Sequence, residues 1–363
     1  MPSTTICNPR GIPFKLSKSE LSFRPILSLV IPVYNGGIWF KRLIENICLQ
    51  LDKDKDLENK IEVILSIDAP TDGSDNIALE ASYKYPAIIK SILHDNVGLV
   101  GNRNIGMQLA QGEYIIFADH DDLFSENAFS KIIGFLEKYN PDILCFRARV
   151  IDGDDKHLQF APKVPEGLHS GRDHILMGGL GFGTIWDLAI KNELIRKNNL
   201  YSLKYWLSED WTLRVNALMI ADKVLGVNDT LYQWRQAGES ASHNAKANQK
   251  YFEAKIFYLI NHLNTAQINN IHDYKAWNII FLQEIRYIMA VMFRSKLKLN
   301  GLKIGISRTR FFFRHWLKKF GKPKDITSLK IIGGILLLPY AGHIGKLVMI
   351  LRKIRLMRIP YNE

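Results

Sequence analysis

The sequence predicts an α/β protein with a mostly parallel sheet flanked on both faces by helices. Two apolar runs, ILSLVIPV at residues 26–33 and IEVILSI at residues 61–67, lack the alternation of half-exposed strands and are typical of strands buried on both sides. Each run ends in a polar turn, and a segment with the spacing of an amphipathic helix follows, as at residues 40–51. Because strands that alternate with helices build parallel sheets, this order predicts the fold class.

The remaining elements continue the alternation. Strands are expected at residues 88–93, 114–118, 142–150 and 224–234, and helices at residues 75–85, 98–110, 126–139, 185–198 and 209–221. Residues 1–25 are interpreted as an N-terminal extension, since they are polar, are interrupted by proline and glycine, and lack an apolar stretch long enough for a signal peptide. A soft boundary near residue 243 separates the α/β domain, residues 26–243, from a mainly helical, basic C-terminal region, residues 244–363. Long helices are expected there at residues 251–263 and 276–293.

Composition and charge exclude some classes of protein. With 47% hydrophobic residues among 363, the chain can bury a large core and is not disordered. The net charge of +12 arises in the C-terminal region, where residues 244–363 hold 22 Lys and Arg against 5 Asp and Glu. Residues 1–243 hold 26 against 31. The three cysteines are far apart and show neither metal-ligand spacing nor a disulfide framework, which fits a reducing cytosol.

An unusual density of negative charge follows the strand at residues 114–118. The segment FADHDDLF, residues 117–124, packs three aspartates into four positions, and their mutual repulsion is costly unless a positive charge comes among them. Ligands of parallel sheets bind beyond the carboxyl ends of the strands, where all the polar turns of this chain are expected. One edge of the sheet should therefore carry five carboxylates: Asp68, Asp95, Asp119, Asp121 and Asp122. The alternative, a helix cap near residues 125–127, explains one aspartate better than three.

Four motifs, in order, resemble those of the family 2 glycosyltransferases of the GT-A fold. They are Pro32-Val33-Tyr34-Asn35, then Asp68 to Ser74, then Asn96 to Gly106, then Asp119-His120-Asp121-Asp122. The resemblance is strong over residues 26–125 and looser to about residue 243. It departs from the family pattern at Ile67, at Ala69-Pro70 and at Asn102, which weakens the transfer of a role to Asp68.

The resemblance implies a donor site and a metal site for Mn²⁺ or Mg²⁺, hard cations that prefer oxygen ligands. It implies that Asp121 is a metal ligand, that Asp119 contacts the ribose or the metal through water, and that Asp122 lies near the sugar or acceptor. His243 could complete the metal site, although a lone histidine in a polar loop is more often solvated. The residues implied for binding the nucleotide are Pro32, Tyr34, Asn35, Asp68, Asn96, Arg103 and Asp119.

The general base is expected later in the chain. Ser208-Glu209-Asp210-Trp211 resembles the Glu-Asp motif that starts a helix beneath the acceptor site, which implies Asp210 as the base, Glu209 as the second choice and Trp211 as an acceptor contact. The same residues would also favour a helix N-terminus without any catalytic role. The segment Tyr232-Gln233-Trp234-Arg235 resembles a further family motif, but the Gln-x-x-Arg-Trp signature of processive synthases is absent, which favours transfer of one sugar.

The function that the resemblance implies is an inverting, metal-dependent glycosyltransferase. It would move one sugar, from a UDP-linked donor, to a growing glycan or lipid-linked glycan of a bacterial surface polysaccharide such as capsule or O-antigen. A nucleotidyltransferase is disfavoured because no basic, glycine-rich loop follows the first strand. A catalytically silent nucleotide- or glycan-binding protein is disfavoured by the joint presence of Asp119, Asp121 and Asp210.

The basic C-terminal region suggests an anionic partner. Residues 294–358 contain 17 Lys and Arg and a single acidic residue, interleaved with aromatic side chains. The apolar stretch IIGGILLLPYAGHIG is shorter than the roughly 20 residues needed to span a bilayer, so the region would lie on an anionic leaflet. This predicts a cytoplasmic protein at the inner face of the cytoplasmic membrane. Nucleic acid is not expected as a partner, since no nucleic-acid-binding module is recognisable; an ordinary helical domain with solvated lysines remains the alternative.

Overall fold

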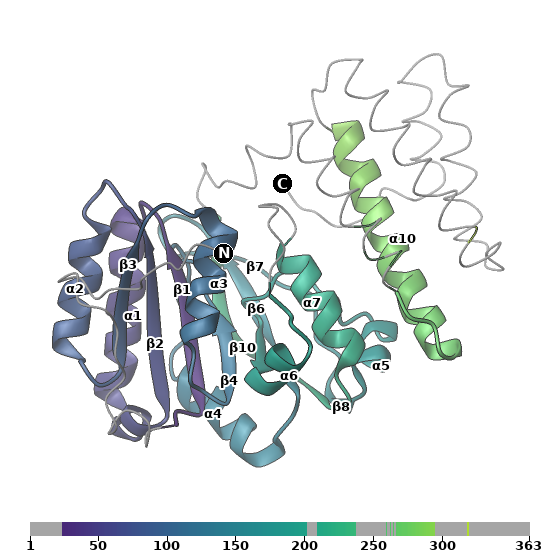
Figure 1. Ribbon diagram of the computed structural model, residues 1–363, viewed down its shortest axis with the longest axis horizontal. Helices are drawn as coiled ribbons and strands as arrows, with labels where there is room; N and C mark the ends of the chain where they lie inside the picture. Colours follow the sequence, from purple (N-terminus) through teal and green to yellow (C-terminus); the bar gives the residue numbers. More distant parts are fainter. Residues whose placement is uncertain are drawn as a thin grey trace. The chain divides into compact units, whose positions relative to one another are not determined.

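The computed structural model describes residues 24–201, 209–236 and 266–294, with side chains of the last range as far as Glu284, and four single positions. The chain divides into two compact units, Met1–Ala237 and Gly238–Glu363 (Figure 1). The predicted boundary at residue 243 and the predicted helix at residues 251–263 lie outside, or almost wholly outside, the described residues. In the second unit the expected helix at residues 276–293 is present as α10, Ile271–Arg294.

The first unit has the predicted alternation of strands and helices. In chain order its elements are β1 (Leu27–Val33), α1 (Gly37–Lys53), η1 (Lys55–Asn59), β2 (Ile61–Asp68), α2 (Ser74–Lys84), β3 (Ile89–His94), α3 (Gly98–Leu109), β4 (Tyr114–Phe117), β5 (Leu123–Phe124), α4 (Ala128–Tyr139), β6 (Ile143–Ile151), β7 (His157–Phe160), β8 (Gly167–His169), α5 (Gly171–Leu176), β9 (Leu188–Lys191), α6 (Asn192–Lys197), α7 (Glu209–Ile220) and β10 (Val224–Arg235).

These strands form one sheet in the order β3-β2-β1-β4-β9-β6-β10-β5, with β7 beside β6 and β8 beside β10. The half β3-β2-β1-β4 is parallel, and β6 and β10 are parallel to each other. Strand β9 lies between the two parallel groups and is antiparallel to both β4 and β6. The predicted α/β class with a Rossmann-like sheet is confirmed, and the complete sheet is mixed.

One predicted element differs in type, and β5, β7, β8 and α5 were not predicted. The helix predicted at residues 185–198 is a strand over Leu188–Lys191 followed by the short helix α6. Strand β9 pairs with both β4 and β6. The backbone N–H and C=O groups on the facing edges of those two strands thereby obtain hydrogen-bond partners. Tertiary pairing therefore overrides the local helical pattern.

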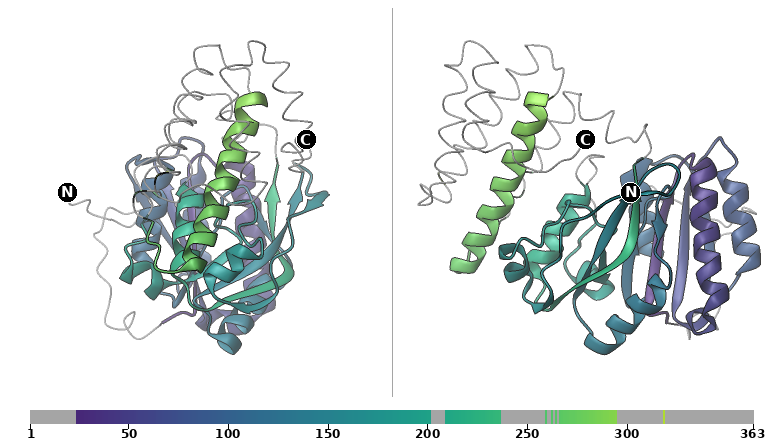
Figure 2. Two further views of the ribbon diagram at one scale, coloured as in Figure 1. Left: turned by 90° about the vertical axis from the view of Figure 1, so that its right-hand side faces the viewer. Right: turned by 180° about the vertical axis from the view of Figure 1, so that it is seen from behind.

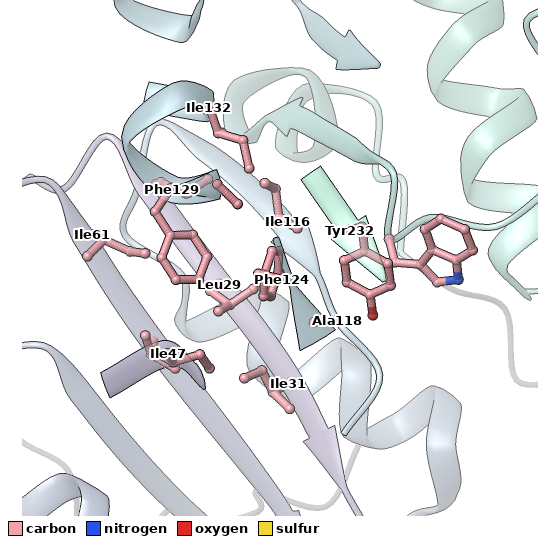
Figure 3. Packing of buried hydrophobic residues seen from close by; sticks show 14 of the residues in the cluster. Leu29, Ile31, Ile47, Ile61, Ile116, Ala118, Phe124, Phe129, Ile132 and Tyr232 are labelled. Carbon is pink, nitrogen blue, oxygen red and sulfur yellow. The ribbon is translucent and has the colours of Figure 1, made fainter. Parts of the chain in front are cut away.

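The helices cover both faces of the sheet (Figures 1 and 2). Alternate residues of β1 and β2 pack under α1, α2 and α4 in one continuous hydrophobic cluster, part of which Figure 3 shows around Leu29, Ile47 and Phe129. On the other face α3 lies so close to β1 that a Cβ on Gly106 would come within 2.5 Å of Val30. A sheet buried on both sides explains the uninterrupted apolar runs of the sequence.

Candidate functional site

The turns after β1 and β2 are joined by hydrogen bonds at the carboxyl edge of the sheet. The Asn35 Oδ1 accepts from the backbone N–H of Thr71 at 2.7 Å, and the backbone N–H of Gly37 donates to Asp72 at 2.8 Å. Asn35 adopts a left-handed conformation with φ 49°, which asparagine tolerates better than most residues. Asn35 thus orders the turn, while Tyr34 beside it is 49% exposed and open to a ligand.

Asp68 organises the start of α3. Its carboxylate is 2% exposed and accepts from the backbone N–H groups of Val97 at 2.6 Å and Gly98 at 3.0 Å. His94, its register neighbour on β3, places Nδ1 3.5 Å from the same carboxylate. Both oxygens are therefore used within the protein, which favours a structural role for Asp68 over the predicted contact with a base. The predicted donor residue Asn96 is exposed in the adjoining turn.

Arg103 contacts two segments of the chain that are far apart in the sequence. Its side chain is 3% exposed, and it donates through Nη2 to Asp119 at 2.7 Å and through Nη1 to Glu209 at 2.7 Å and to Asp210. Asp119 follows β4, whereas Glu209 and Asp210 begin α7. The buried Arg103 side chain thus brings together Asp119, predicted to bind the nucleotide, and the two predicted bases, Glu209 and Asp210.

The electrostatics of this cluster distinguish the two candidate bases. Burial lowers the pKa of the Arg103 guanidinium, but the charges of Asp210, Asp119 and Glu209 outweigh burial and raise it. Burial, reinforced by the charge of Asp210, raises the pKa of Glu209 despite the opposing effect of Arg103. The side chain of Glu209 is 6% exposed and that of Asp210 is 24% exposed. Asp210 is the carboxylate that an acceptor hydroxyl could reach.

The segment Asp119–Asp122, here called the acidic loop, contains three aspartates with different surroundings. Burial raises the pKa of Asp121, and the charge of Asp119 adds to the effect. No other described residue donates a hydrogen bond to its carboxylate. The loop therefore presents Asp121 as a half-buried carboxylate that accepts no hydrogen bond from another described residue.

The surroundings of Asp122, predicted to lie near the sugar or acceptor, are filled by partners within the protein. Asp122 is 1% exposed, and its two oxygens accept from the Tyr232 hydroxyl at 2.7 Å and from the backbone N–H of Arg235 at 2.7 Å. The Tyr232 hydroxyl in turn accepts from the backbone N–H of Asp119 at 3.1 Å. This geometry favours a structural role in which Asp122 fastens the acidic loop to β10.

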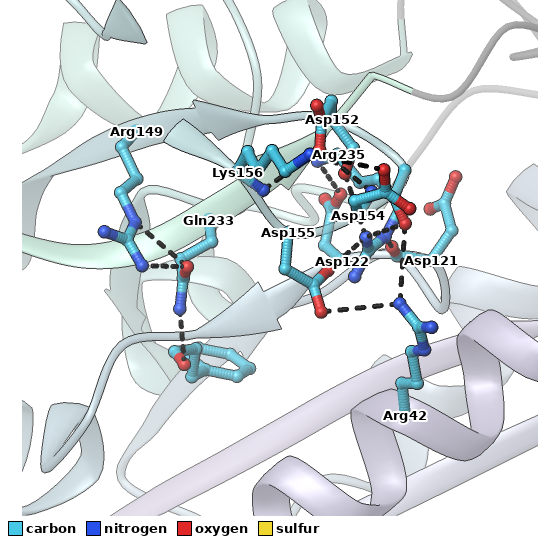
Figure 4. Close-up of polar contacts among 12 residues, drawn as sticks. Arg42, Asp121, Asp122, Arg149, Asp152, Asp154, Asp155, Lys156, Gln233 and Arg235 are labelled. Carbon is cyan, nitrogen blue, oxygen red and sulfur yellow. Dashed lines mark hydrogen bonds and ion pairs between the residues drawn. The ribbon is translucent and has the colours of Figure 1, made fainter. Parts of the chain in front are cut away.

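Arg235 secures the same loop from a second side (Figure 4). Its Nε donates to the Asp121 carbonyl at 2.8 Å, and its Nη1 donates to Asp155 in the turn between β6 and β7. The guanidinium lies 4.3 Å from the centre of the Trp39 ring, and Arg42 lies 4.9 Å from that ring. Sequence reasoning assigned no role to this residue or to Tyr232. Their place in the Tyr-Gln-Trp-Arg motif was the available signal.

Three further predicted residues are placed as follows. Pro32 is buried in β1, where its carbonyl lies 3.3 Å from Nδ1 of His120. Trp211, predicted to contact the acceptor, is 5% exposed and packs against Gly183. His243, predicted as a metal ligand, lies outside the described residues.

Within the described segments, no group of three or more His, Cys, Asp and Glu side chains gathers as a metal site by itself. The surroundings of Asp121 nevertheless fit a divalent cation, because two neighbouring carboxylates repel each other and one of them has no donor from another residue. Asp119 uses Oδ1 for Arg103. Two carboxylates suffice for a cation that shares its coordination with phosphate oxygens.

Comparison with known proteins agrees with these motifs. Residues 28–198 match the family model described as Glycosyl transferase family 2. The chain is 28% identical over 243 residues to the minor teichoic acid biosynthesis protein GgaB of Bacillus subtilis, a match that covers 64% of this chain and 26% of GgaB. It is 30% identical over 218 residues to the cholesterol galactosyltransferase of Borreliella burgdorferi, which covers 57% of this chain and 59% of that protein.

Solved structures show the same fold. Residues 1–349 of Staphylococcus aureus TarS superpose with a TM-score of 0.65 at 16% identity, covering 91% of each chain. The mannosyltransferase PcManGT of Pyrobaculum calidifontis superposes with a TM-score of 0.51 at 14% identity, covering 92% of this chain and 88% of its own. Residues 28–198, with the four motifs in order, are therefore a glycosyl transferase family 2 domain, and the fold is that of these solved structures.

Proposed function

We propose that this chain transfers one sugar, with inversion, from a UDP-linked donor to a hydroxyl group of a growing surface glycan. The observation that carries the proposal is the buried Arg103, which holds Asp119 beside β4 and Asp210 at the start of α7 in one cluster. A donor bound at the carboxyl edge of the parallel strands would lie next to a carboxylate that can accept a proton. That is the arrangement that an inverting displacement requires.

The donor class is supported by the relatives. TarS of Staphylococcus aureus, named a poly(ribitol-phosphate) β-N-acetylglucosaminyltransferase, has been solved with UDP and with UDP-GlcNAc. In this chain, the exposed Tyr34 and the turn at Asn96 border the space where the base and ribose would lie. The names of GgaB and TarS support a surface polymer such as a teichoic acid, a capsule or a related glycan as the acceptor.

Asp210 would act as the general base. The acceptor oxygen forms a bond to the anomeric carbon while the bond to the diphosphate breaks, the electron pair leaves with the diphosphate, and the hydroxyl proton passes to the Asp210 carboxylate. Arg103 orients Asp210 through its hydrogen bond and holds it close to Asp119. Glu209, almost completely buried, accepts a hydrogen bond from Arg103 at 2.7 Å.

Asp121, with Asp119, would hold Mn²⁺ or Mg²⁺ together with the oxygens of the donor diphosphate. Bound there, the cation supplies positive charge that offsets the charge of the leaving diphosphate. PcManGT, whose structure contains GDP-Man and Mn²⁺, supports this use of the fold. Tyr232 and Arg235 hold the backbone of the acidic loop in place for such a ligand.

The test is a screen of nucleotide-sugar donors in which release of the nucleoside diphosphate is measured with an acceptor glycan, with Mn²⁺ and with EDTA. Asp210→Asn should keep donor affinity but lower turnover by about 10² to 10⁴, the contribution of a general base. The control is Asp222→Asn, because Asp222 is exposed and lies just after the C-terminal end of α7. The turnover of this variant should equal that of the wild type. Undiminished turnover of Asp210→Asn would place the base elsewhere.

A further inference from the structure

A glycine-rich loop lies against α7, the helix that begins with the proposed base. Residues 178–187 read GGLGFGTIWD, and three of the glycines have positive φ: 93° at Gly178, 54° at Gly181 and 79° at Gly183. Residues other than glycine are strained at positive φ, because their Cβ clashes with the backbone. The loop therefore adopts a backbone conformation that requires glycine at these three positions.

Gly183 contacts the residue that follows the proposed base. A Cβ on Gly183 would lie 2.5 Å from Cε3 of Trp211, well inside van der Waals contact. Trp211 is 5% exposed, so moving its indole ring into solvent would expose buried apolar surface. The absence of a side chain at residue 183 thus sets how far the first turn of α7 can rotate.

Arg214 fastens the loop one helical turn further along. Its Nη1 donates to the Thr184 carbonyl at 2.9 Å and to Asp187 at 2.6 Å, and its Nη2 donates to the Gly179 carbonyl at 2.9 Å. The side chain is 1% exposed. Residues four apart share one face of a helix, so Arg214 holds the face of α7 that also carries Asp210.

We propose that the loop at residues 178–187 is the positioning element for the base. Gly183 and Arg214 are its positioning residues, because they fix the rotation of α7 at which Asp210 meets Arg103. Neither residue touches a reacting atom. The inference rests on the proposed role of Asp210 and adds the reason why its carboxylate has one defined position.

The experiment compares two glycines of the same loop. Gly183→Ala introduces a methyl group that collides with Trp211, whereas Gly178→Ala adds one at a similar positive φ with nothing within 4 Å of its Cβ. Both variants should lose stability through backbone strain, and Gly183→Ala should lose more because of the collision, which thermal unfolding will show. Only Gly183→Ala should displace α7, and hydrogen–deuterium exchange of residues 209–220 should rise in that variant alone.

Turnover provides the second measurement. A misplacement of about 1 Å at a reacting group can cost on the order of 100-fold in rate. Gly183→Ala should therefore lower kcat by that order while the KM for the donor stays close to that of the wild type, and Gly178→Ala should keep its kcat. In a Trp211→Leu background the collision is relieved, so Gly183→Ala should have little further effect, a coupling that a double-mutant cycle measures.

The two proposals fail in different ways. If the wild type transfers no sugar from any donor, the proposed function is wrong, and the exchange of α7 still decides whether the loop controls that helix. Equal exchange and equal kcat in the two glycine variants would overturn the positioning role. So would an undiminished effect of Gly183→Ala when Trp211 is replaced by leucine.

Discussion

At the scale of single residues, the neighbouring aspartates Asp121 and Asp122 of the acidic loop are expected to affect the free energy of unfolding in opposite directions. Asp121 is a half-buried carboxylate with a raised pKa and no donor among the other described residues, whereas Asp122 accepts from the Tyr232 hydroxyl and the Arg235 backbone N–H. Burial raises the pKa of Asp122 as well, but its hydrogen bonds give it a structural function. Poor compensation of Asp121 is what a cation site requires before the cation arrives.

The same substitution at these two positions should therefore act in opposite directions. In EDTA at pH 7, Asp121→Asn removes an unfavourable half-buried charge and should raise the free energy of unfolding by up to about 1 kcal/mol, while transfer is abolished. Asp122→Asn replaces an acceptor oxygen with a donor and should lower the free energy of unfolding by about 1 to 3 kcal/mol. Denaturation in urea measures both, and destabilisation by Asp121→Asn would contradict this account of the loop.

At the scale of secondary structure, a buried carboxylate ties together the amino ends of the strands. Glu62, completely buried at the start of β2, accepts from the Ser28 hydroxyl at 2.6 Å, from the Gly112 N–H at 3.1 Å and from Lys90 at 3.0 Å. These partners lie on β1, in the turn before β4 and on β3. One side chain therefore fixes the relative positions of four strands at the end of the sheet opposite to the proposed active site.

Replacement of Glu62 should affect stability without affecting chemistry. Glu62→Leu leaves Lys90, the Ser28 hydroxyl and the Gln111 N–H without this acceptor and should cost about 3 to 5 kcal/mol, as when one partner of a buried ion pair is removed. The turnover of the molecules that remain folded should match that of the wild type, because the acidic loop lies at the other end of the strands. Glu58→Gln, an exposed change in η1, is the control. Equal urea midpoints for the two variants would refute the role of Glu62.

Secondary structure was predictable where the pattern was local and long. The apolar runs of β1 and β2 and the helical spacing of α1 predicted those elements closely. β9 was not predictable, because only four residues form it and its strand state depends on β4 and β6 on either side. Its neighbours in space come from residues that are distant in sequence, so no window of the sequence contains the reason.

At the scale of the whole molecule, charge is divided along the chain. The region after residue 243 carries the excess of positive charge, and residues 294–358 contain 17 Lys and Arg with one acidic residue. In the described parts of the chain, no helix is both long and apolar enough to cross a membrane. We propose that the basic region attaches the protein to an anionic leaflet, where lipid-linked acceptors would be presented.

Truncation tests this attachment. A protein ending at residue 293 should no longer sediment with vesicles that contain anionic lipid, because each Lys or Arg near such a surface contributes about 1 kcal/mol. Attachment of the full chain should weaken in high salt, which screens these charges, and should be absent with neutral vesicles. Equal sedimentation of the truncated and full-length proteins would show that the basic region does not bind the membrane.

The sequence by itself determined the class of the fold, the edge at which the acidic loop lies and the location of the positive charge, since each follows from local pattern or from simple counting. Only the tertiary structure decided how the site is assembled. Arg103 meets Asp210 across 107 positions of the chain, and Asp122 meets Tyr232 across 110. Such partners depend on how the strands pack, so identical Asp residues in one loop acquire different surroundings only through the neighbours that folding places beside them.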